Sequence, residues 1–241
     1  MTGWIVPDWP AADAVRALVT TREGGVSTGA YASLNLGDHV GDDPAAVAEN
    51  RRRLRAQLPA EPLWLGQVHG ASVVDAATAR PGVAADASVA RGPGPVCAVM
   101  TADCLPVLLC DEAGTAVCAA HAGWRGLAGG VLEAAVAAMG VPPAQLMAWL
   151  GPAIGPQSFE VGEDVRAAFL AHSAGAELAF APKTQGKWLA DLYALATQRL
   201  NAAGVARVFG GGLCTFNDAE RFYSFRRDKA TGRMAALIWI A

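Results

Sequence analysis

Short apolar segments between residues 63 and 120 constrain the fold more than any other feature of the sequence. Each is four to six residues long and is separated from the next by turn-forming or polar residues. Segments of this length are typical of strands, since helices generally need roughly ten residues or more. They predict a central sheet, with strands at residues 63–68, 72–75, 87–90, 96–100, 107–110 and 116–120.

Helices are predicted on both sides of this strand-rich region. Asp43 and Pro44 have the residue types of a helix N-cap and first helical position, which predicts a helix from Pro44 to about residue 57. Further helices are predicted at residues 124–139, 162–171 and 187–203. Further strands are predicted at residues 16–21, 145–150, 205–209, 222–225 and 234–240. With no linker or repeat, we expect one α+β domain over residues 1–241, with a mixed sheet and helices packed outside it.

The composition argues against several classes of protein. The formal net charge is −3 and there is no basic tract, so nucleic acid is not an expected partner. Apolar residues make up 53% of the chain but form no membrane-spanning stretch, and the N-terminus has no signal-peptide pattern. The odd number of cysteines, five, predicts a reduced cytoplasmic protein rather than a disulfide framework. The sequence does not predict an oligomeric state.

Three potential metal ligands lie at the ends of predicted strands. His69 ends one apolar segment, Cys104 lies between two others, and His121 ends a fourth. If these strands are neighbours in a sheet, the three side chains converge. Two imidazoles and one thiolate suit Zn²⁺, and three protein ligands leave a fourth position for water or substrate, as in catalytic sites. Spacing alone leaves an alternative, in which the histidines are hydrogen-bonded at strand ends and Cys104 is a buried thiol.

The other cysteines and histidines have simpler interpretations. Burial in the core or chemical inertness is expected for Cys97, Cys110, Cys118 and Cys214. Exposure to solvent is expected for His39, His172 and the helix face that carries Arg51, Arg52, Arg53 and Arg55.

Several longer motifs resemble a single protein family. QVHG (67–70), TADCLPVLL (101–109), HAGWRGL (121–127) and FYSFRRDKATGRMAALIWI (222–240) closely resemble the bacterial laccase-domain proteins. That family is also called multicopper polyphenol oxidoreductase or peptidoglycan-editing-factor-like. TTREGGVS (20–27), SLNLGDHVGDDPAAVAENRRRL (33–54) and GPAIGPQSFEVGEDV (151–165) fit it as well. The resemblance covers essentially the whole chain, with no departure at the three metal positions.

The resemblance implies an α/β/β/α sandwich with mixed sheets, similar to cysteine-hydrolase-like toxin domains. It implies Zn²⁺ on His69, Cys104 and His121, with copper as the alternative metal. It also implies a purine nucleoside phosphorylase of bacterial type, acting on adenosine, inosine, guanosine and methylthioadenosine with phosphate, and deaminating adenosine. The polyphenol-oxidase label is disfavoured, because four histidines are too few for a multi-copper laccase centre.

Catalytic roles in this chemistry are expected for Cys104, His121 and Asp103. Deamination requires a water-derived nucleophile, which bound zinc supplies for attack on C6 of adenine, and a proton shuttle. Asp103 is the candidate shuttle. Neighbouring residues of an extended segment point to opposite faces, so a structural hydrogen bond is the alternative role for Asp103 beside Cys104.

Phosphorolysis requires cationic side chains that bind phosphate, and arginine is well suited to this. The candidates are Arg22, Arg125, Arg226 and Arg227. Arg125 follows His121 by four residues and lies near a predicted helix start, where backbone N–H groups also attract anions. Arg226 and Arg227 are expected to alternate in a strand, so that only one of them faces the site. The alternative is that these arginines pair with carboxylates such as Asp103 or Asp228.

Three other functions remain open at this stage. Cys104 and His121 could form a metal-free nucleophile–base pair for hydrolysis or deamidation. The site could instead sense or buffer metal without catalysis. A third possibility is an enzyme that edits cell-wall (peptidoglycan) precursors, whose substrate would be an amino-acid-bearing nucleotide.

Overall fold

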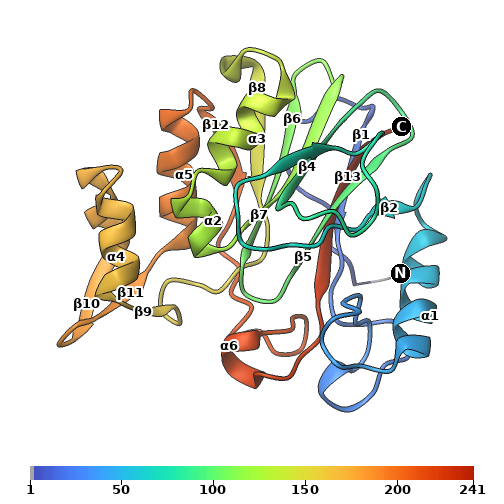
Figure 1. The fold of residues 1–241 in the computed structure, drawn as a ribbon, viewed down its shortest axis with the longest axis horizontal. Coiled ribbons are helices and arrows are strands. Elements are labelled where there is room, and N and C mark those ends of the chain that lie inside the picture. Colours follow the sequence, from blue (N-terminus) through green and yellow to red (C-terminus); the bar gives the residue numbers. More distant parts are fainter. Residues whose placement is uncertain (1–2) are drawn as a thin grey trace.

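Two mixed β-sheets lie face to face in the computed structural model, which describes residues 3–241 (Figure 1). The first sheet has the order β1 (Val15–Val19), β13 (Met234–Ile240), β5 (Val96–Thr101) and β2 (Pro62–Leu63). The second has the order β12 (Arg207–Gly210), β8 (Leu146–Leu150), β6 (Leu105–Asp111), β7 (Ala116–Ala122), β4 (Ala87–Arg91) and β3 (Val73–Asp75). Each sheet contains both parallel and antiparallel pairs.

Alternation along β5 shows how the layers are built. Cys97 and Val99 point between the two sheets, where they pack with Leu108 of β6. Ala98 and its alternate neighbours point the other way, into a cluster with Leu54. Successive side chains of a strand point to opposite faces. Both faces of β5 are buried because the second sheet covers one and the cluster with Leu54 covers the other.

Helices cover both outer faces of the paired sheets. Helix α1 (Pro44–Arg55) supplies Leu54 to the cluster on the first sheet, and Asp43 caps it by accepting from the Ala45 N–H. Helices α3 (Val131–Met139) and α5 (Leu192–Ala202) pack on the second sheet (Figure 1). The α+β class and the α/β/β/α sandwich implied by the resemblance are therefore confirmed.

The predicted helix 124–139 is interrupted in the structure. It divides into α2 (Trp124–Ala128) and α3, because Gly130 adopts a positive φ of 94° between them. Only glycine adopts this conformation readily, so the chain changes direction there.

A third, three-stranded sheet was not expected from the sequence. It consists of β9 (Glu160–Gly162), β11 (Lys187–Ala190) and β10 (Phe180–Thr184), with α4 (Glu163–Leu170) beside it at the left of Figure 1. The predicted helix 187–203 is wrong over its first four residues, which form β11. Asp191 then accepts from the Ala194 N–H and starts α5, as an N-cap does.

The predicted strand 222–225 is also wrong. Phe222 and Tyr223 are fully buried, but Ser224 accepts a hydrogen bond from the Arg227 N–H and begins the short helix α6 (Phe225–Asp228). A serine cap outweighs the strand propensity of the aromatic residues here. Arg226 and Arg227 therefore lie in a helix and do not alternate across a strand.

The remaining elements are short. The 3₁₀ helices are η1 (Gly29–Tyr31), η2 (Pro143–Gln145) and η3 (Ala174–Ala179). The predicted strand 63–68 is reduced to β2, and residues 64–70 form a loop that leads to His69. Within residues 3–241, no helix has the length and apolar character needed to cross a membrane.

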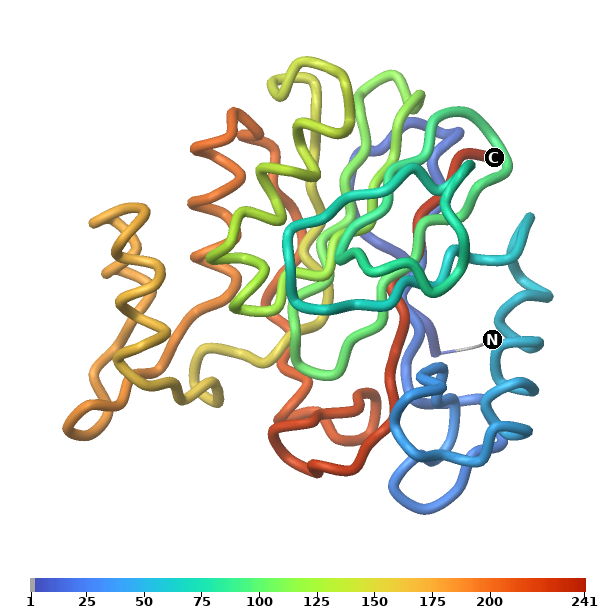
Figure 2. The backbone as a smooth tube through the Cα atoms, in the orientation of Figure 1, coloured from blue at the N-terminus to red at the C-terminus, as the bar shows by residue number. Residues whose placement is uncertain are grey.

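The N-terminal and C-terminal parts of the chain lie side by side. In Figure 2, the blue backbone of residues 20–42 runs next to the red backbone of residues 213–233. Tyr223 donates a hydrogen bond to the Tyr31 carbonyl, and the Arg233 N–H donates to Asn35 Oδ1 at 2.9 Å. Together these segments form one wall of the cavity described below.

Candidate metal centre

His69, Cys104 and His121 come together at one edge of the sandwich. Their potential ligand atoms all lie within 4.8 Å of one another, and Cys104 Sγ is 3.8 Å from His69 Nε2. In a tetrahedral zinc site the separation of a sulfur and a nitrogen ligand is about 3.6 Å, from bond lengths of about 2.3 Å and about 2.05 Å. The three side chains are thus spaced to hold a small transition-metal ion and leave a fourth position open.

The strand pairing explains the convergence. β6 and β7 are antiparallel neighbours, with Leu105 opposite Ala122 and Pro106 opposite His121. Cys104, the residue before β6, is therefore adjacent to His121 at the end of β7. His69 approaches from the loop after β2 and has a positive φ of 61°, an uncommon conformation outside glycine that aims the loop at the other two ligands.

A buried carboxylate holds both histidines in place. Asp86, at the start of β4, accepts a hydrogen bond from His121 Nδ1 at 2.8 Å. It also accepts from the backbone N–H groups of Val68, His69 and Gly70 at 2.7–3.1 Å. With Nδ1 bonded to Asp86, the Nε2 atom of His121 is free to bind metal, and such partners are regular companions of metal-bound histidine.

Sequence reasoning missed Asp86. The only signal was a single acidic residue at the head of an otherwise apolar strand, in AADASVA. Burial opposes ionisation of Asp86, but its bonds to His121 and to the backbone N–H groups hold the pKa of the carboxyl below its usual range.

Cys104 and His121 have shifted pKa values. Burial raises the pKa of the Cys104 thiol, but the charge of His121 and hydrogen bonds from both histidines outweigh it and lower the pKa to about 6. For His121, burial lowers the pKa, but the Cys104 charge and the Asp86 contact raise it to about 9. Cys104 is therefore a thiolate at neutral pH, the form that binds metal and attacks as a nucleophile.

Gly123 leaves space for the three ligands. A Cβ at this position would lie 2.8 Å from His69 Cδ2, 3.0 Å from Cys104 Sγ and 3.5 Å from His121 Cε1. Every larger residue would therefore press on the ligand atoms. The glycine after HA in the HAGWRGL motif is explained by this contact.

A cavity of about 980 Å³ opens beside the three ligands. Its volume lies at the upper end of the range for small-molecule sites. Its wall combines apolar groups, including Trp64 and the half-exposed Phe225, with the cationic side chains of Arg51 and Arg233. This combination can hold a flat apolar ring and an anion next to a metal ion.

Two residues expected at the surface line this cavity. His39 is exposed but lies in the cavity wall. Arg51, expected on a solvated helix face, lies with its guanidinium carbon 4.6 Å from the centre of the Trp64 ring. The prediction was wrong for Arg51 because helical periodicity does not reveal what packs beside a helix, whereas Arg52 and Arg53 do pair with Glu49 on the exposed face.

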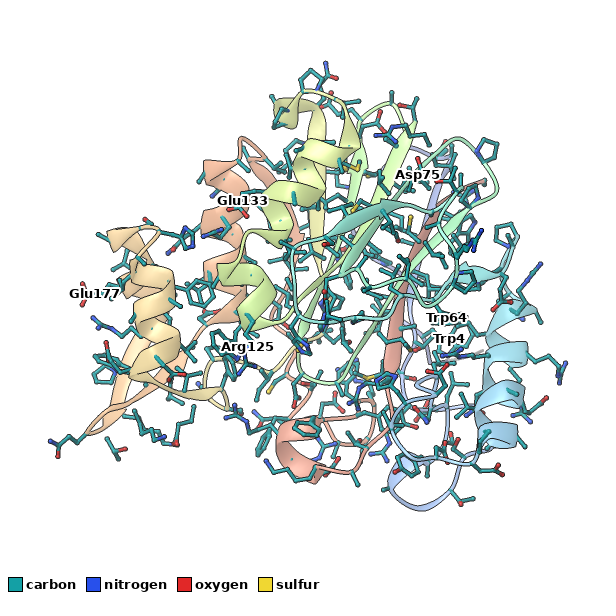
Figure 3. All side chains as sticks on the ribbon, in the orientation of Figure 1. Trp4, Trp64, Asp75, Arg125, Glu133 and Glu177 are labelled. Atoms are coloured by element: carbon teal, nitrogen blue, oxygen red, sulfur yellow. The ribbon has the colours of Figure 1, made fainter. Side chains whose placement is uncertain are left out.

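The four arginines proposed from the sequence lie elsewhere. Within the described residues, the cavity wall includes none of them. Arg22 donates to the carbonyls of Ala32 and Ala219, and joins two loops. Arg125 is exposed, stacks on Trp124 with its guanidinium carbon 4.4 Å from the ring centre, and extends from α2 well away from Trp64 (Figure 3).

Arg226 and Arg227 bind protein carbonyls. Arg226 Nη1 donates to the Glu160 carbonyl at 2.7 Å. Arg227 donates to three backbone carbonyls and to the carboxylate of Asp228, as the alternative interpretation allowed. Arg226 thus ties α6 to β9, and Arg227 ties it to the loop that holds Thr215 and Phe216.

Asp103 also has structural partners. Its two oxygens accept from Thr215 Oγ1 and from the Arg226 N–H, both at 2.6 Å. Its φ of 90° turns the chain immediately before Cys104. These contacts match the structural alternative raised from the sequence, and Asp103 is not among the residues that line the cavity in the described part of the chain.

The core cysteines behave as expected. Cys97, Cys110 and Cys118 are fully buried, and burial raises the pKa of each thiol. They stay protonated and unreactive at neutral pH, in contrast to Cys104.

Comparison with known proteins gives consistent matches over the whole chain. Residues 16–241 match the family described as multi-copper polyphenol oxidoreductase laccase. A protein of Pseudomonas aeruginosa named purine nucleoside phosphorylase is 58% identical over 241 residues, covering 100% of this chain and 99% of the relative. The purine nucleoside phosphorylase YfiH of Escherichia coli is 55% identical over 244 residues, covering 100% of both chains.

Solved structures agree with these matches. A crystal structure of a Neisseria meningitidis protein superposes with a TM-score of 0.96 at 56% identity, covering 99% of each chain. YlmD from Geobacillus stearothermophilus superposes with a TM-score of 0.92 at 31% identity, covering 99% of this chain and 96% of that one.

Proposed function

The chain belongs to the multi-copper polyphenol oxidoreductase laccase family, and from this premise we propose that it is a zinc-dependent purine nucleoside phosphorylase. The observation that carries the proposal is the His69–Cys104–His121 centre on the wall of a large, partly apolar and partly cationic cavity. The relatives named purine nucleoside phosphorylase support the substrate class.

The donor set favours zinc over copper. One thiolate and two imidazoles with one open position are typical of a catalytic zinc site. A laccase needs several copper ions for electron transfer to O₂, and the described residues offer one three-ligand group. Bound zinc would act as a Lewis acid beside the substrate.

The cavity walls suit a nucleoside. The exposed ring of Phe225 and the side chain of Val68 offer apolar surface to a purine base. In phosphorolysis, the bond between the ribose anomeric carbon and the base nitrogen breaks, and its electron pair leaves with the base. A phosphate oxygen forms the new bond to the anomeric carbon, which gives ribose 1-phosphate, and the base takes up the proton that the hydrogen phosphate loses. The protein must therefore hold phosphate and ribose together and keep both oriented.

The proposal extends to related substrates and reactions. Adenosine, inosine, guanosine and methylthioadenosine share the purine ribonucleoside frame that the cavity would recognise. Deamination of adenosine at the same centre is supported by the open fourth position of the ligand set. We further propose that residues 1–241 act as one domain, and the five free cysteines support a cytoplasmic location.

One experiment tests the proposal directly. Metal is quantified in the purified protein, which is then incubated with inosine and phosphate while hypoxanthine and ribose 1-phosphate are measured. We expect about one zinc per chain, turnover that is lost on chelation and restored by zinc, and no turnover by Cys104→Ala purified in parallel. Undiminished turnover by Cys104→Ala would reveal a contaminating phosphorylase and would overturn the proposal.

A metal-free cysteine hydrolase is the second candidate, and one observation favours it. Cys104, His121 and Asp86 form a chain of contacts in which a thiolate meets an imidazole that a carboxylate orients. This is the arrangement of a nucleophile, a base and its orienting group. In that case the protein as isolated would lack stoichiometric metal, and amide or ester substrates would acylate Cys104.

A further inference from the structure

We infer that Arg51, on α1, and Arg233, in the C-terminal segment before β13, form the phosphate subsite of the cavity. The inference deepens the proposed function and rests on it for the identity of the substrate. The ligand is a phosphate dianion, either inorganic phosphate or the phosphate group of a nucleotide. Arg51 and Arg233 take the phosphate-binding role that the sequence analysis assigned to four other arginines.

Arg51 carries donors that protein acceptors do not exhaust. Its Nε donates to the Leu36 carbonyl at 2.9 Å, and its Nη1 lies 3.2 Å from a carboxylate oxygen of Asp38. Its Nη2 is buried, yet has no hydrogen-bond partner among residues 3–241. The guanidinium lies against Trp64, which shields one of its faces from water and fixes its plane.

The guanidinium of Arg233 has even fewer protein partners than that of Arg51. Its Nη1 donates to the carbonyls of Thr231 and Gly232, and these are its only side-chain hydrogen bonds to the described residues. In that part of the chain, no carboxylate lies within ion-pair distance of it. The side chain is half-buried, so its charge is partly removed from water with no carboxylate of the described residues in direct ion-pair contact. A partly desolvated guanidinium with free donors is a strong site for an oxyanion.

One segment of the chain positions both arginines. Residues 35–38 contact Arg51 through the Leu36 carbonyl and Asp38, and the stem of Arg233 lies against Gly37. A Cβ on Gly37 would come within 2.8 Å of Arg233 Cγ, so only glycine permits this packing. The side chain of Asn35 accepts hydrogen bonds from the Gly37 and Arg233 N–H groups, which ties this segment to the residue that precedes β13.

The charges in this wall favour an anion. Arg51, Arg233 and His39 are the cationic or potentially cationic groups of the wall beyond the metal ligands, and Asp38 is the carboxylate that faces them. Arg233 and the three metal ligands line the same cavity. A phosphate bound here lies in the same cavity as the metal and beside Phe225, where the proposed reaction needs it.

The experiment measures phosphate binding apart from turnover. Zinc-loaded wild-type protein, Arg51→Gln and Arg233→Gln are dialysed to equilibrium against radiolabelled inorganic phosphate. Arg52→Gln is the matched control, because Arg52 neighbours Arg51 on α1 but pairs with Glu49 on the exposed face. We expect each of the two variants to bind phosphate at least about tenfold more weakly, and the control to bind within about twofold of wild type.

A second arm separates the two sources of phosphate. Inosine 5′-monophosphate and unlabelled phosphate compete for the labelled ion in wild-type protein. If the nucleotide displaces the label at lower concentration than phosphate does, the subsite takes an ester phosphate. If phosphate displaces it better and the Michaelis constant for phosphate rises in both variants, the subsite takes the free ion.

Lysine variants distinguish loss of phosphate binding from loss of the folded structure. Arg51→Lys and Arg233→Lys keep the charge and lose the planar fork, so intermediate affinities are expected. Phosphate binding by both glutamine variants within twofold of wild type would overturn the subsite, as would a wild-type protein that binds neither phosphate nor nucleotide. Binding that depends on both arginines, in a protein without phosphorolysis, would sustain the subsite and overturn the proposed function instead.

Discussion

The carboxylate of Asp86 lies 2.8 Å from Nδ1 of His121, at the centre of a contact set that also holds the backbone of His69. One buried side chain, immediately before β4, thus positions two ligands that reach the metal centre from different segments. Removing its negative charge should weaken metal binding without removing any ligand.

We therefore expect Asp86→Asn to lower the affinity for zinc by about 10- to 100-fold, since partners of metal-bound histidines have effects of this size. Competition with a chromophoric chelator measures the affinity. Asp75→Asn is the control, because Asp75 is a half-exposed carboxylate on β3 that contacts the Ala77 N–H at 2.8 Å and Arg91 at 3.5 Å, and none of the three ligands. Equal affinities for Asp86→Asn and wild type would mean that the backbone of residues 68–70 fixes the centre by itself.

Gly123→Ala should disrupt the same centre sterically. The added Cβ would lie 2.8 Å from the His69 ring and 3.0 Å from Cys104 Sγ, so at least one ligand must move. We expect zinc content to fall well below one per chain, measured by elemental analysis. Gly175→Ala is the comparison, because a Cβ there meets its nearest neighbour at 3.5 Å and should leave the zinc content unchanged. Full zinc occupancy in Gly123→Ala would contradict the geometry of the centre.

Cys104 should react as a thiolate in metal-free protein. Its pKa of about 6 lies below the ordinary thiol value of about 8.5, so the reactive form persists at neutral pH and disappears as the pH falls through 6. Alkylation by iodoacetamide, followed by mass spectrometry from pH 4.5 to 9, should show a half-maximal rate near pH 6. Added zinc should protect the residue, and the Cys104→Ser variant supplies the background. A midpoint at pH 8 or above would contradict the charge pairing with His121.

Arg227→Ala should lower stability rather than act on phosphate. The guanidinium donates to the carbonyls of Thr215, Phe216 and Phe222, and its removal leaves these part-buried acceptors unsatisfied. A loss of about 2–3 kcal/mol in the free energy of unfolding is expected from urea titration. Arg221→Ala, which removes a half-exposed contact to Asp218, should cost less than about 1 kcal/mol. If the two variants are equally stable, the carbonyl contacts of Arg227 contribute little.

Sequence analysis identified the candidate metal ligands because they lie where apolar segments end. His69, Cys104 and His121 stand where apolar segments end, and strand ends converge wherever strands are neighbours. The central strands and α1 could be predicted for the same reason. Their periodicity and caps are local properties of the sequence.

The residues that were missed depend on packing between distant segments. Arg51 belongs to the cavity because Trp64 and Leu36 lie beside α1, which helical spacing does not encode. Arg233 enters through the packing of β13 against residues 35–37. Arg226 and Arg227 were misassigned because a serine cap follows two buried aromatic residues, and local propensity favoured a strand there.

The order of the first sheet has a consequence for biosynthesis. β13 lies between β1 and β5, yet it follows every other strand in the chain. A ribosome has therefore made β1, β5 and all three metal ligands while the slot between those strands is still empty. The segments that carry His69, Cys104 and His121 are complete at that stage, whereas the part of the cavity wall that carries Arg233 is made only with the last strand.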